Sequence, residues 1–380
     1  MSNADRRTTL CVATPTGRGA VATVVVRGPN AVEIVSNCFS SAAGRPLASF
    51  EPCRIVFGKW TGGERGNEEL VVCRRDTETV EIHCHGGHAA VQAICQSLSA
   101  QGCKSDDWAE FVKRREDDPI AADALVALSE ARTERVAAIL MDQYRGALRN
   151  AVTSVIDALR HDNQTSAQNQ LLQLRRASQV GLHLTEPWRI VIAGPANAGK
   201  SSLINALLGY QRSIVFNEPG TTRDVVTANT AFDGWPVELA DTAGFRHKHQ
   251  PLEAIGQSLA EDRVATADLV VLVFDISQPW STDDQSLINQ TKQPVLVHNK
   301  CDLATRSDDH PDGYWVSAKT GEGLKGLIEQ IVQRLVPTRP APGSAVPFRR
   351  QHALIVYKAL HLMETLAPSA NAIDVLCKSF

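Results

Sequence analysis

The sequence has few aromatic residues, no apolar run long enough for a membrane span and no paired-cysteine motif. Phe, Trp and Tyr together make up 5% of the 380 residues. Apolar runs such as Leu269–Phe274 are far shorter than the roughly 20 residues that cross a bilayer, so the sequence predicts no contact with a membrane. Nine cysteines occur without a CxxC pair, and the polar start carries no apolar signal core. We therefore expect free thiols and a cytoplasmic protein.

The chain also lacks a strong charge of either sign. Its formal net charge is −3 at pH 7, with 43% hydrophobic and 21% charged residues. A surface that binds polyanions along the whole chain is therefore excluded, whereas a local basic patch is not. The apolar content is too high for a mainly disordered chain, and the length predicts two or three domains.

The first part of the chain, residues 1–104, has the pattern of a small α+β domain. Short runs of β-branched residues end at turn-forming Gly, Pro and Asn, which is typical of strands. Apolar residues at three- and four-residue spacing between these runs predict helices. The predicted strands are Val21–Val26, Arg54–Trp60, Leu70–Arg74 and Thr79–Cys84, and the predicted helices are Ala31–Cys38 and Ala89–Ala100.

Two separate parts of the chain have helical spacing throughout. Ala121–Leu159 carries apolar residues every three or four positions and is interrupted only at Gly146, and a second helix is predicted at Ala167–Val180. A Pro-rich joint at Val336–Gly343 precedes a final helical stretch from Val346 onward. These patterns predict helical segments at 105–185 and 345–380.

Between the helical parts, short apolar strands alternate with helical segments. This alternation predicts a mostly parallel sheet that is covered on both faces, within residues 186–336. The predicted strands are Arg189–Ala193, Val237–Ala240, Leu269–Asp275 and Pro294–His298.

A phosphate-binding motif follows the first of these strands. Gly194–Ser202 matches GxxxxGK[ST] and opens a predicted helix at Leu203–Leu208. The glycines let backbone N–H groups surround phosphates, and the helix N-terminus favours negative charge. We expect Lys200 to reach the β- and γ-phosphates and Ser201 to ligate Mg²⁺.

Three further motifs occur in the order typical of GTP-binding proteins. Asp241–Gly244 ends a strand, so Asp241 can hold Mg²⁺ and Gly244 can approach the γ-phosphate. In Asn299–Asp302, the carboxylate of Asp302 can accept the two hydrogen bonds that guanine offers and adenine lacks. Ser317–Lys319 is suited to donate to guanine O6. The ordered set resembles the P-loop GTPase superfamily.

Further motifs, inside and outside residues 186–336, indicate a particular family of these GTPases. Pro219–Asp224 resembles the switch I signature of TrmE–Era-type GTPases. Ala13–Val21, Val80–Gly87, Leu252–Gly256 and Phe348–Arg350 are similar to segments of the tRNA modification GTPase family MnmE, also called TrmE. The resemblance spans nearly the whole chain.

The resemblance implies an α/β GTPase domain inserted in an all-α helical domain, behind an N-terminal α+β domain. The implied domains are 1–104 (folate-type and dimer-forming), 105–185 (helical, first part), 186–336 (GTPase) and 345–380 (helical, second part). It also implies GTP hydrolysis in tRNA wobble-uridine (U34) modification, with an MnmG-like flavoprotein partner and a homodimer through the N-terminal domain. Basic clusters at Lys113–Arg115, Arg175–Arg176 and Arg349–Arg350 are candidates for tRNA contact.

The same resemblance assigns catalytic roles. Asn197 matches an asparagine that helps to bind K⁺, together with backbone carbonyls of Phe216–Glu218, and Glu253 matches a glutamate that orients the attacking water. Thr222 completes the Mg²⁺ ligands. The catalytic candidates are thus Glu253, Lys200 and Asn197. The GTP-binding candidates are Asn197, Ala198, Gly199, Lys200, Ser201, Ser202, Phe216, Thr221, Thr222, Asp241, Thr242, Ala243, Gly244, Asn299, Lys300, Asp302, Ser317, Ala318 and Lys319.

The sequence departs from the family pattern in two places. The family ends in C-x-G-K, whereas Cys377 is followed by Lys378 without that spacing, so no role is assigned to Cys377. The tetrahydrofolate segment is altered, with Arg27 and Glu81 as the remaining candidates. Two alternatives therefore stay open: a diverged paralogue that hydrolyses GTP without modifying tRNA, and a GTP-dependent regulatory switch or scaffold.

Overall fold

The computed structural model describes residues 7–15, 19–62, 68–210, 227–241, 266–304, 310–365 and 369–379. The chain divides into two compact units, residues 1–122 and 123–380. Within the described residues, no helix is both long and apolar enough to cross a membrane.

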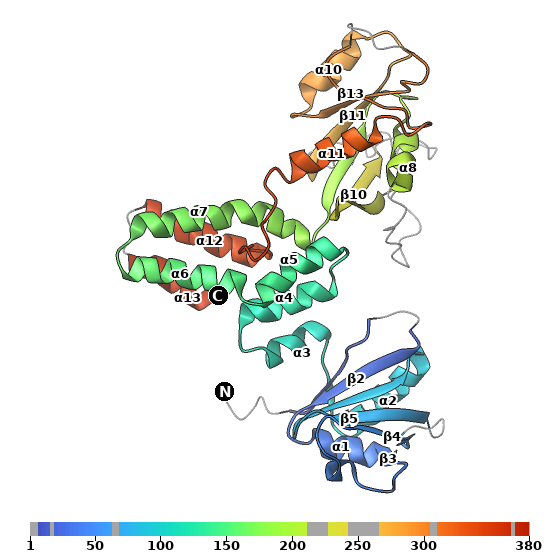
Figure 1. The fold of residues 1–380 in the computed structure, drawn as a ribbon, viewed down its shortest axis with the longest axis vertical. Coiled ribbons are helices and arrows are strands. Elements are labelled where there is room, and N and C mark those ends of the chain that lie inside the picture. Colours follow the sequence, from blue (N-terminus) through green and yellow to red (C-terminus); the bar gives the residue numbers. More distant parts are fainter. Residues whose placement is uncertain are drawn as a thin grey trace, which may run out of the picture. The chain divides into compact units, whose positions relative to one another are not determined.

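The N-terminal unit is a seven-stranded sheet with helices (Figure 1). The strand order is β3-β4-β5-β6-β2-β1-β7. The predicted strands and helices are confirmed to within a few residues at their ends, and the structure adds β1, β3, β7 and α3, most of which are too short to carry a clear pattern. The elements are β1 Thr9–Val12, β2 Val21–Arg27, α1 Ala31–Cys38, β3 Phe39–Ser41, β4 Ile55–Trp60, β5 Glu68–Arg74, β6 Thr79–His85, α2 His88–Ala100, β7 Lys104–Ser105 and α3 Trp108–Arg115.

One face of this sheet is buried and the other is partly open. Along β2, Ala22, Val24 and Val26 are buried in a core with α1 and α2, because successive strand residues point to opposite faces. The opposite face is less covered: Ile55 and Phe57 of β4 are 70% and 52% exposed. The N-terminal unit therefore presents an apolar strand at the surface.

The nine cysteines are free thiols, as predicted. Five of the seven in the N-terminal unit are buried, and Cys53 is exposed. Burial raises the pKa of Cys11, Cys84 and Cys103 to about 11. These buried thiols therefore behave as small apolar core residues.

The second unit begins with helices that break where the sequence pattern does not. The prediction that Gly146 alone interrupts the helical stretch Ala121–Leu159 is wrong. A second break follows Ser129, so the stretch forms three helices, α4, α5 and α6. Thr133 begins α5 by accepting a hydrogen bond from the backbone of Val136, and Gly146, with φ at 103°, precedes α6. The helices are α4 Pro119–Ser129, α5 Glu134–Tyr144, α6 Ala147–Arg160, α7 Gln164–Gly181, α12 Arg350–Glu364 and α13 Ser369–Ser379.

Helices from the two ends of this unit pack together. The late helix α12 packs against α7, and α13 packs against both α12 and α6 (Figure 1). Gln143, which is fully buried, accepts a hydrogen bond from the backbone N–H of Val346 and donates to the carbonyl of Ser344. These contacts fix the point where the chain re-enters the helices.

The remaining part of the second unit, here called the G part, is a six-stranded sheet of order β13-β12-β11-β8-β10-β9. All neighbours are parallel except β9, which pairs antiparallel with β10, so the mostly parallel sheet is confirmed. The elements are β8 Trp188–Ala193, α8 Lys200–Tyr210, β9 Thr227–Phe232, β10 Trp235–Asp241, β11 Leu269–Asp275, α10 Thr282–Gln290, β12 Val295–Asn299, β13 Tyr314–Trp315 and α11 Leu324–Leu335.

The turn between β9 and β10 contacts the helices. The Thr133 hydroxyl donates to the Gly234 carbonyl at 2.7 Å. Arg135 donates to the Asp233 carbonyl at 2.8 Å and forms an ion pair with its carboxylate at 3.1 Å. Arg339, in the segment after α11, reaches the same carboxylate at 2.7 Å. The turn, the start of α5 and this segment are thus held together.

Candidate nucleotide-binding site

The predicted motifs meet at one edge of the G sheet. The phosphate loop follows β8, Asp241 is the last residue of β10 and Asn299 is the last residue of β12. Because these strands are parallel, their carboxyl ends lie at the same edge, which is where ligands bind in open α/β sheets.

Two glycines of the phosphate loop are required by their surroundings. Gly194 has φ at 142°, and a Cβ there would lie 2.1 Å from the carbonyl oxygen of Val273. Gly199 has φ at 90°, and a Cβ there would lie 2.3 Å from the amide nitrogen of Asn299. Asn197 has φ at 61°, a conformation that Asn adopts more readily than most residues. The loop backbone therefore packs directly against β11 and the Asn299 side chain.

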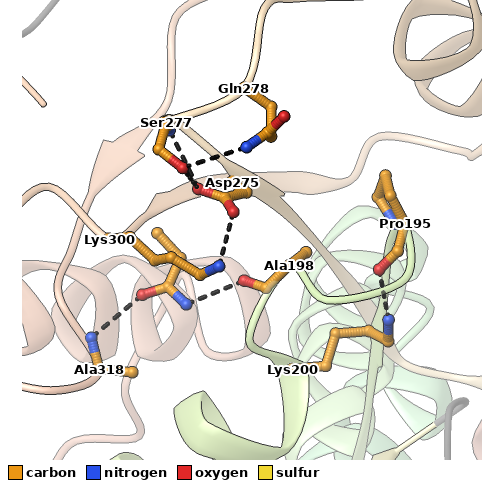
Figure 2. Close-up of polar contacts among 9 residues, drawn as sticks. Pro195, Ala198, Lys200, Asp275, Ser277, Gln278, Lys300 and Ala318 are labelled. Carbon is orange, nitrogen blue, oxygen red and sulfur yellow. Dashed lines mark hydrogen bonds and ion pairs between the residues drawn. The ribbon is translucent and has the colours of Figure 1, made fainter. Parts of the chain in front are cut away.

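The Lys200 ammonium lies inside this loop. It donates to the carbonyls of Gly194 at 3.0 Å and of Pro195 at 2.6 Å, the second of which is drawn in Figure 2. Lys200 is 7% exposed. A buried ammonium needs such acceptors, and phosphate oxygens are acceptors of the same kind with a full negative charge.

The two predicted Mg²⁺ ligands that the structure describes lie next to each other. The Ser201 hydroxyl donates to the Asp241 carboxylate at 2.5 Å, and Asp241 is 3% exposed. Mg²⁺ prefers hard oxygen ligands of these two kinds, so this pair fits the metal.

The residues predicted to bind guanine form a connected group. The Asn299 amide donates to the Ala198 carbonyl at 2.9 Å and accepts from the Ala318 N–H at 3.0 Å, so it ties two loops together (Figure 2). The Ser317 hydroxyl donates to the Asp302 carboxylate at 2.7 Å. A pocket of about 200 Å³ is lined by Gly199, Ser202, Asn299, Lys300, Asp302, Leu303, Ser317, Ala318 and Lys319.

Asp275 belongs to this group, although the sequence analysis did not identify it. Lys300 has φ at 68°, and its ammonium donates to Asp275 at 2.6 Å (Figure 2). The other Asp275 oxygen accepts from the N–H and hydroxyl of Ser277. Burial raises the pKa of Asp275, but hydrogen bonds from Lys300 and Ser277 outweigh this, and the net pKa lies below the ordinary value. Its position as the last residue of the predicted strand Leu269–Asp275, at the carboxyl-end edge of the predicted sheet, is the signal that could have identified it.

Several predicted site residues lie outside the described residues. These are Phe216, Thr221, Thr222, Thr242, Ala243, Gly244 and Glu253, together with the carbonyls of 216–218. Their roles stay predictions.

The folate candidates Arg27 and Glu81 lie on neighbouring strands of the N-terminal sheet. Glu81 is paired with Val25 in the β2–β6 register, and residues two apart share a face, so Arg27 and Glu81 are on the same side. Glu81 forms an ion pair with Arg75 at 2.8 Å and lies 3.5 Å from His83. Cys377 is exposed on α13.

Comparisons with known proteins agree with this geometry. Residues 189–300 match a family model described as 50S ribosome-binding GTPase, and residues 8–116 match one described as GTP-binding protein TrmE N-terminus. The tRNA modification GTPase MnmE of Synechococcus sp. strain WH7803 is 31% identical, over 87% of this chain and 82% of the relative. The chain belongs to the MnmE family of tRNA modification GTPases. This confirms the predicted family, and as a member the chain is a GTP-hydrolysing enzyme.

Other relatives in the MnmE family match to a similar extent. The MnmE of Prochlorococcus marinus strain MIT 9303 is 32% identical over 93% of this chain and 86% of its own. The MnmE of Bacillus subtilis strain 168 is 30% identical over 79% of this chain and 74% of its own.

Among solved structures, the G domain of the T. maritima FeoB iron transporter is 28% identical over 39% of this chain and 99% of its own, with a TM-score of 0.30.

Proposed function

We propose that the chain binds Mg²⁺–GTP at this sheet edge and transfers the γ-phosphoryl group to water. The observation that carries the proposal is the meeting of the phosphate loop, the Ser201–Asp241 pair and the Asn299–Asp302 loop. Lys200 would contact the β- and γ-phosphates, because its ammonium already lies among acceptors inside the loop. Asp302 would pair with guanine, whose N1–H and amino group match a carboxylate.

The Mg²⁺ and K⁺ ligands would come from three segments. Ser201, Asp241 and Thr222 would hold Mg²⁺, which neutralises phosphate charge when bound. Asn197 would be a K⁺ ligand at the phosphates, and Glu253 would orient the attacking water. Support for the last two roles comes from the motif match alone.

The role of Glu253 is tested by Glu253→Ala. We expect nucleotide affinity to stay within twofold while single-turnover hydrolysis falls at least a hundredfold, because only the water loses its orienting group. Glu329→Ala, on the exposed side of α11, is the matched control. A hydrolysis rate near that of the wild type would assign the water to another group.

The role of Asn197 is tested by the choice of monovalent cation. We expect hydrolysis to be much faster in K⁺ than in Na⁺ at equal ionic strength, and Asn197→Ala to remove most of this difference. Equal rates in both salts for the wild type would rule out a K⁺ role for Asn197.

We further propose that GTP hydrolysis drives tRNA wobble-uridine (U34) modification in the cytoplasm, with an MnmG-like flavoprotein as partner. The relatives named above, which are tRNA modification GTPases covered over most of their length, support this role. Basic residues such as Arg175 and Arg176, both exposed on α7, are candidate tRNA contacts.

The domain arrangement belongs to the same proposal. The G part would be an insertion in the helical domain, which the packing of α12 on α7 and α13 on α6 supports. The N-terminal domain would form the homodimer, and exposed Ile55 and Phe57 offer apolar surface for it. A tetrahydrofolate derivative would bind near Arg27 and Glu81.

Complementation tests the biological role. A bacterial strain without its own MnmE should regain the modified wobble uridine when this chain is expressed, as measured by mass spectrometry of tRNA nucleosides. The Lys200→Ala variant should not restore it. If a folded, GTP-hydrolysing wild type restores nothing, the diverged paralogue or the regulatory switch is the better description.

A further inference from the structure

A second cavity lies away from the nucleotide site, within the second unit. It has a volume of about 660 Å³ and is lined by residues of α6, of α7 and of the segment 336–345, here called the linker, which follows α11. This size is typical of small-molecule sites. Its lining is mostly apolar.

Small side chains and a stiff linker keep this cavity open. Ala151 and Ala177 face it from α6 and α7, where larger residues would fill it. Pro337 and Pro340 restrict the linker backbone, because the proline ring fixes φ. The far end of the linker is held by Gln143 and by the Asp142 carboxylate, which accepts from the Gly343 N–H at 2.7 Å. The cavity is therefore formed before any ligand binds.

The charge around the cavity is positive. Arg176 is the charged residue of the lining, and no carboxylate lines it. Arg176 makes no ion pair within the part of the chain that the structure describes. Gln170, Gln173 and Gln179 add amide groups that can donate or accept hydrogen bonds. An anionic group on a ligand would thus meet one guanidinium and no opposing acid.

We propose that this cavity binds a small ligand with an apolar body and one acidic group. The apolar body would lie on Leu174, Val180 and Leu335, which are all buried, and the acidic group would pair with Arg176. None of the lining residues belongs to the nucleotide site. Leu335 ends α11 of the G part, so the ligand would contact the G part, the linker and the helices at once.

The probe for this site is 8-anilino-1-naphthalenesulfonate, which has a flat apolar body and one sulfonate. Titration of the full chain should give a saturable rise in fluorescence. Arg176→Gln should weaken this binding about three- to fivefold, the size expected for losing one ion pair at an exposed guanidinium. Arg175→Gln, the neighbouring exposed arginine that does not line the cavity, should leave it unchanged. The neutral analogue N-phenyl-1-naphthylamine should bind the wild type and Arg176→Gln equally.

Filling the cavity is the second arm of the test. Ala177→Leu should abolish the saturable component while the circular dichroism spectrum and GTP binding stay unchanged. Ala151→Leu fills the same space from α6 and serves if Ala177→Leu fails to fold. The proposal is overturned if the wild type shows no saturable binding, if a folded filled variant binds the probe as well as the wild type does, or if the two arginine variants behave alike.

Discussion

The base end and the phosphate end of the nucleotide site are built differently. At the base end, the carboxylates of Asp302 and Asp275 accept from Ser317 and Lys300, and a carboxylate can accept further donors. At the phosphate end, donors that the ligand would meet are already in use: Lys200 donates to loop carbonyls, and Ser201 donates its hydroxyl hydrogen to Asp241.

This difference predicts separate roles for the two ends of the nucleotide site. A base that enters the first region meets groups already in place, so a mismatched base would cover the exposed Asp302 carboxylate without offering it the two donors of guanine. Phosphates and metal compete with existing hydrogen bonds in the second region, so a contact that displaces an old partner contributes only the difference between the old and new partners. Variants at the base end should therefore change specificity, and variants at the phosphate end should change affinity for any nucleotide.

The largest effect is expected for Asp302→Asn. Asparagine can still accept from Ser317, but it cannot accept both guanine hydrogen bonds, so GTP affinity should fall about a thousandfold. Affinity for xanthosine triphosphate should rise, because the amide can donate to its 2-oxo group. Equilibrium titration with fluorescent analogues of both nucleotides measures this, and a GTP affinity within tenfold of the wild type would contradict a preformed base end.

Lys200→Ala should come next, with GTP and GDP affinity reduced about a hundredfold and the preference for guanine retained. The loss is smaller than the charge suggests, because the ammonium gives up two carbonyl partners when it meets phosphate. Lys325→Ala, at an exposed position on α11, is the control. A change in base preference in Lys200→Ala would contradict the proposed division of roles between the base end and the phosphate end.

Ser201→Ala should weaken the dependence of nucleotide binding on Mg²⁺, with the half-saturating Mg²⁺ concentration raised about tenfold. The variant also frees the Asp241 carboxylate from its short hydrogen bond. Binding in excess EDTA should match the wild type. Ser286→Ala on α10 is the control, and an unchanged Mg²⁺ titration would exclude Ser201 as a ligand.

Asp275→Asn should have the smallest effect, a three- to fivefold loss of guanine-nucleotide affinity with an unchanged hydrolysis rate at saturation. The carboxylate holds the Lys300 ammonium and is not among the groups proposed to contact the phosphates. Because the net pKa of Asp275 is lowered, its charge persists at neutral pH, and the contribution should be lost only as pH falls through that lowered pKa. The affinity ratio of variant to wild type should thus be flat from pH 6 to 9. Asp283→Asn, exposed on α10, is the control.

The sequence predicts those parts of the site that lie within single loops. The phosphate loop and Asn299–Asp302 have fixed spacing, because one turn must place all their groups. The Asp275–Lys300 pair joins the last residue of β11 to the residue just after β12, and only the parallel ladder of these strands brings them together. Likewise, the helical pattern predicted for residues 121–159 gives no break at residues 130–133. In the structure, Thr133 caps the start of α5 there and also donates to the Gly234 carbonyl, which is far away in the sequence. The cavity beside the linker depends on such distant contacts and has no local pattern.

The buried thiols of the N-terminal unit can report when its sheet opens. A thiol reacts with an alkylating reagent only when it is accessible and ionised, so Cys11, Cys84 and Cys103 are silent while their sheet is closed. Exposed Cys53 and Cys377 and the partly buried Cys95 and Cys301 can react while the sheet is closed. Alkylation of the buried thiols then reports transient opening of that sheet in the native chain, without any introduced label.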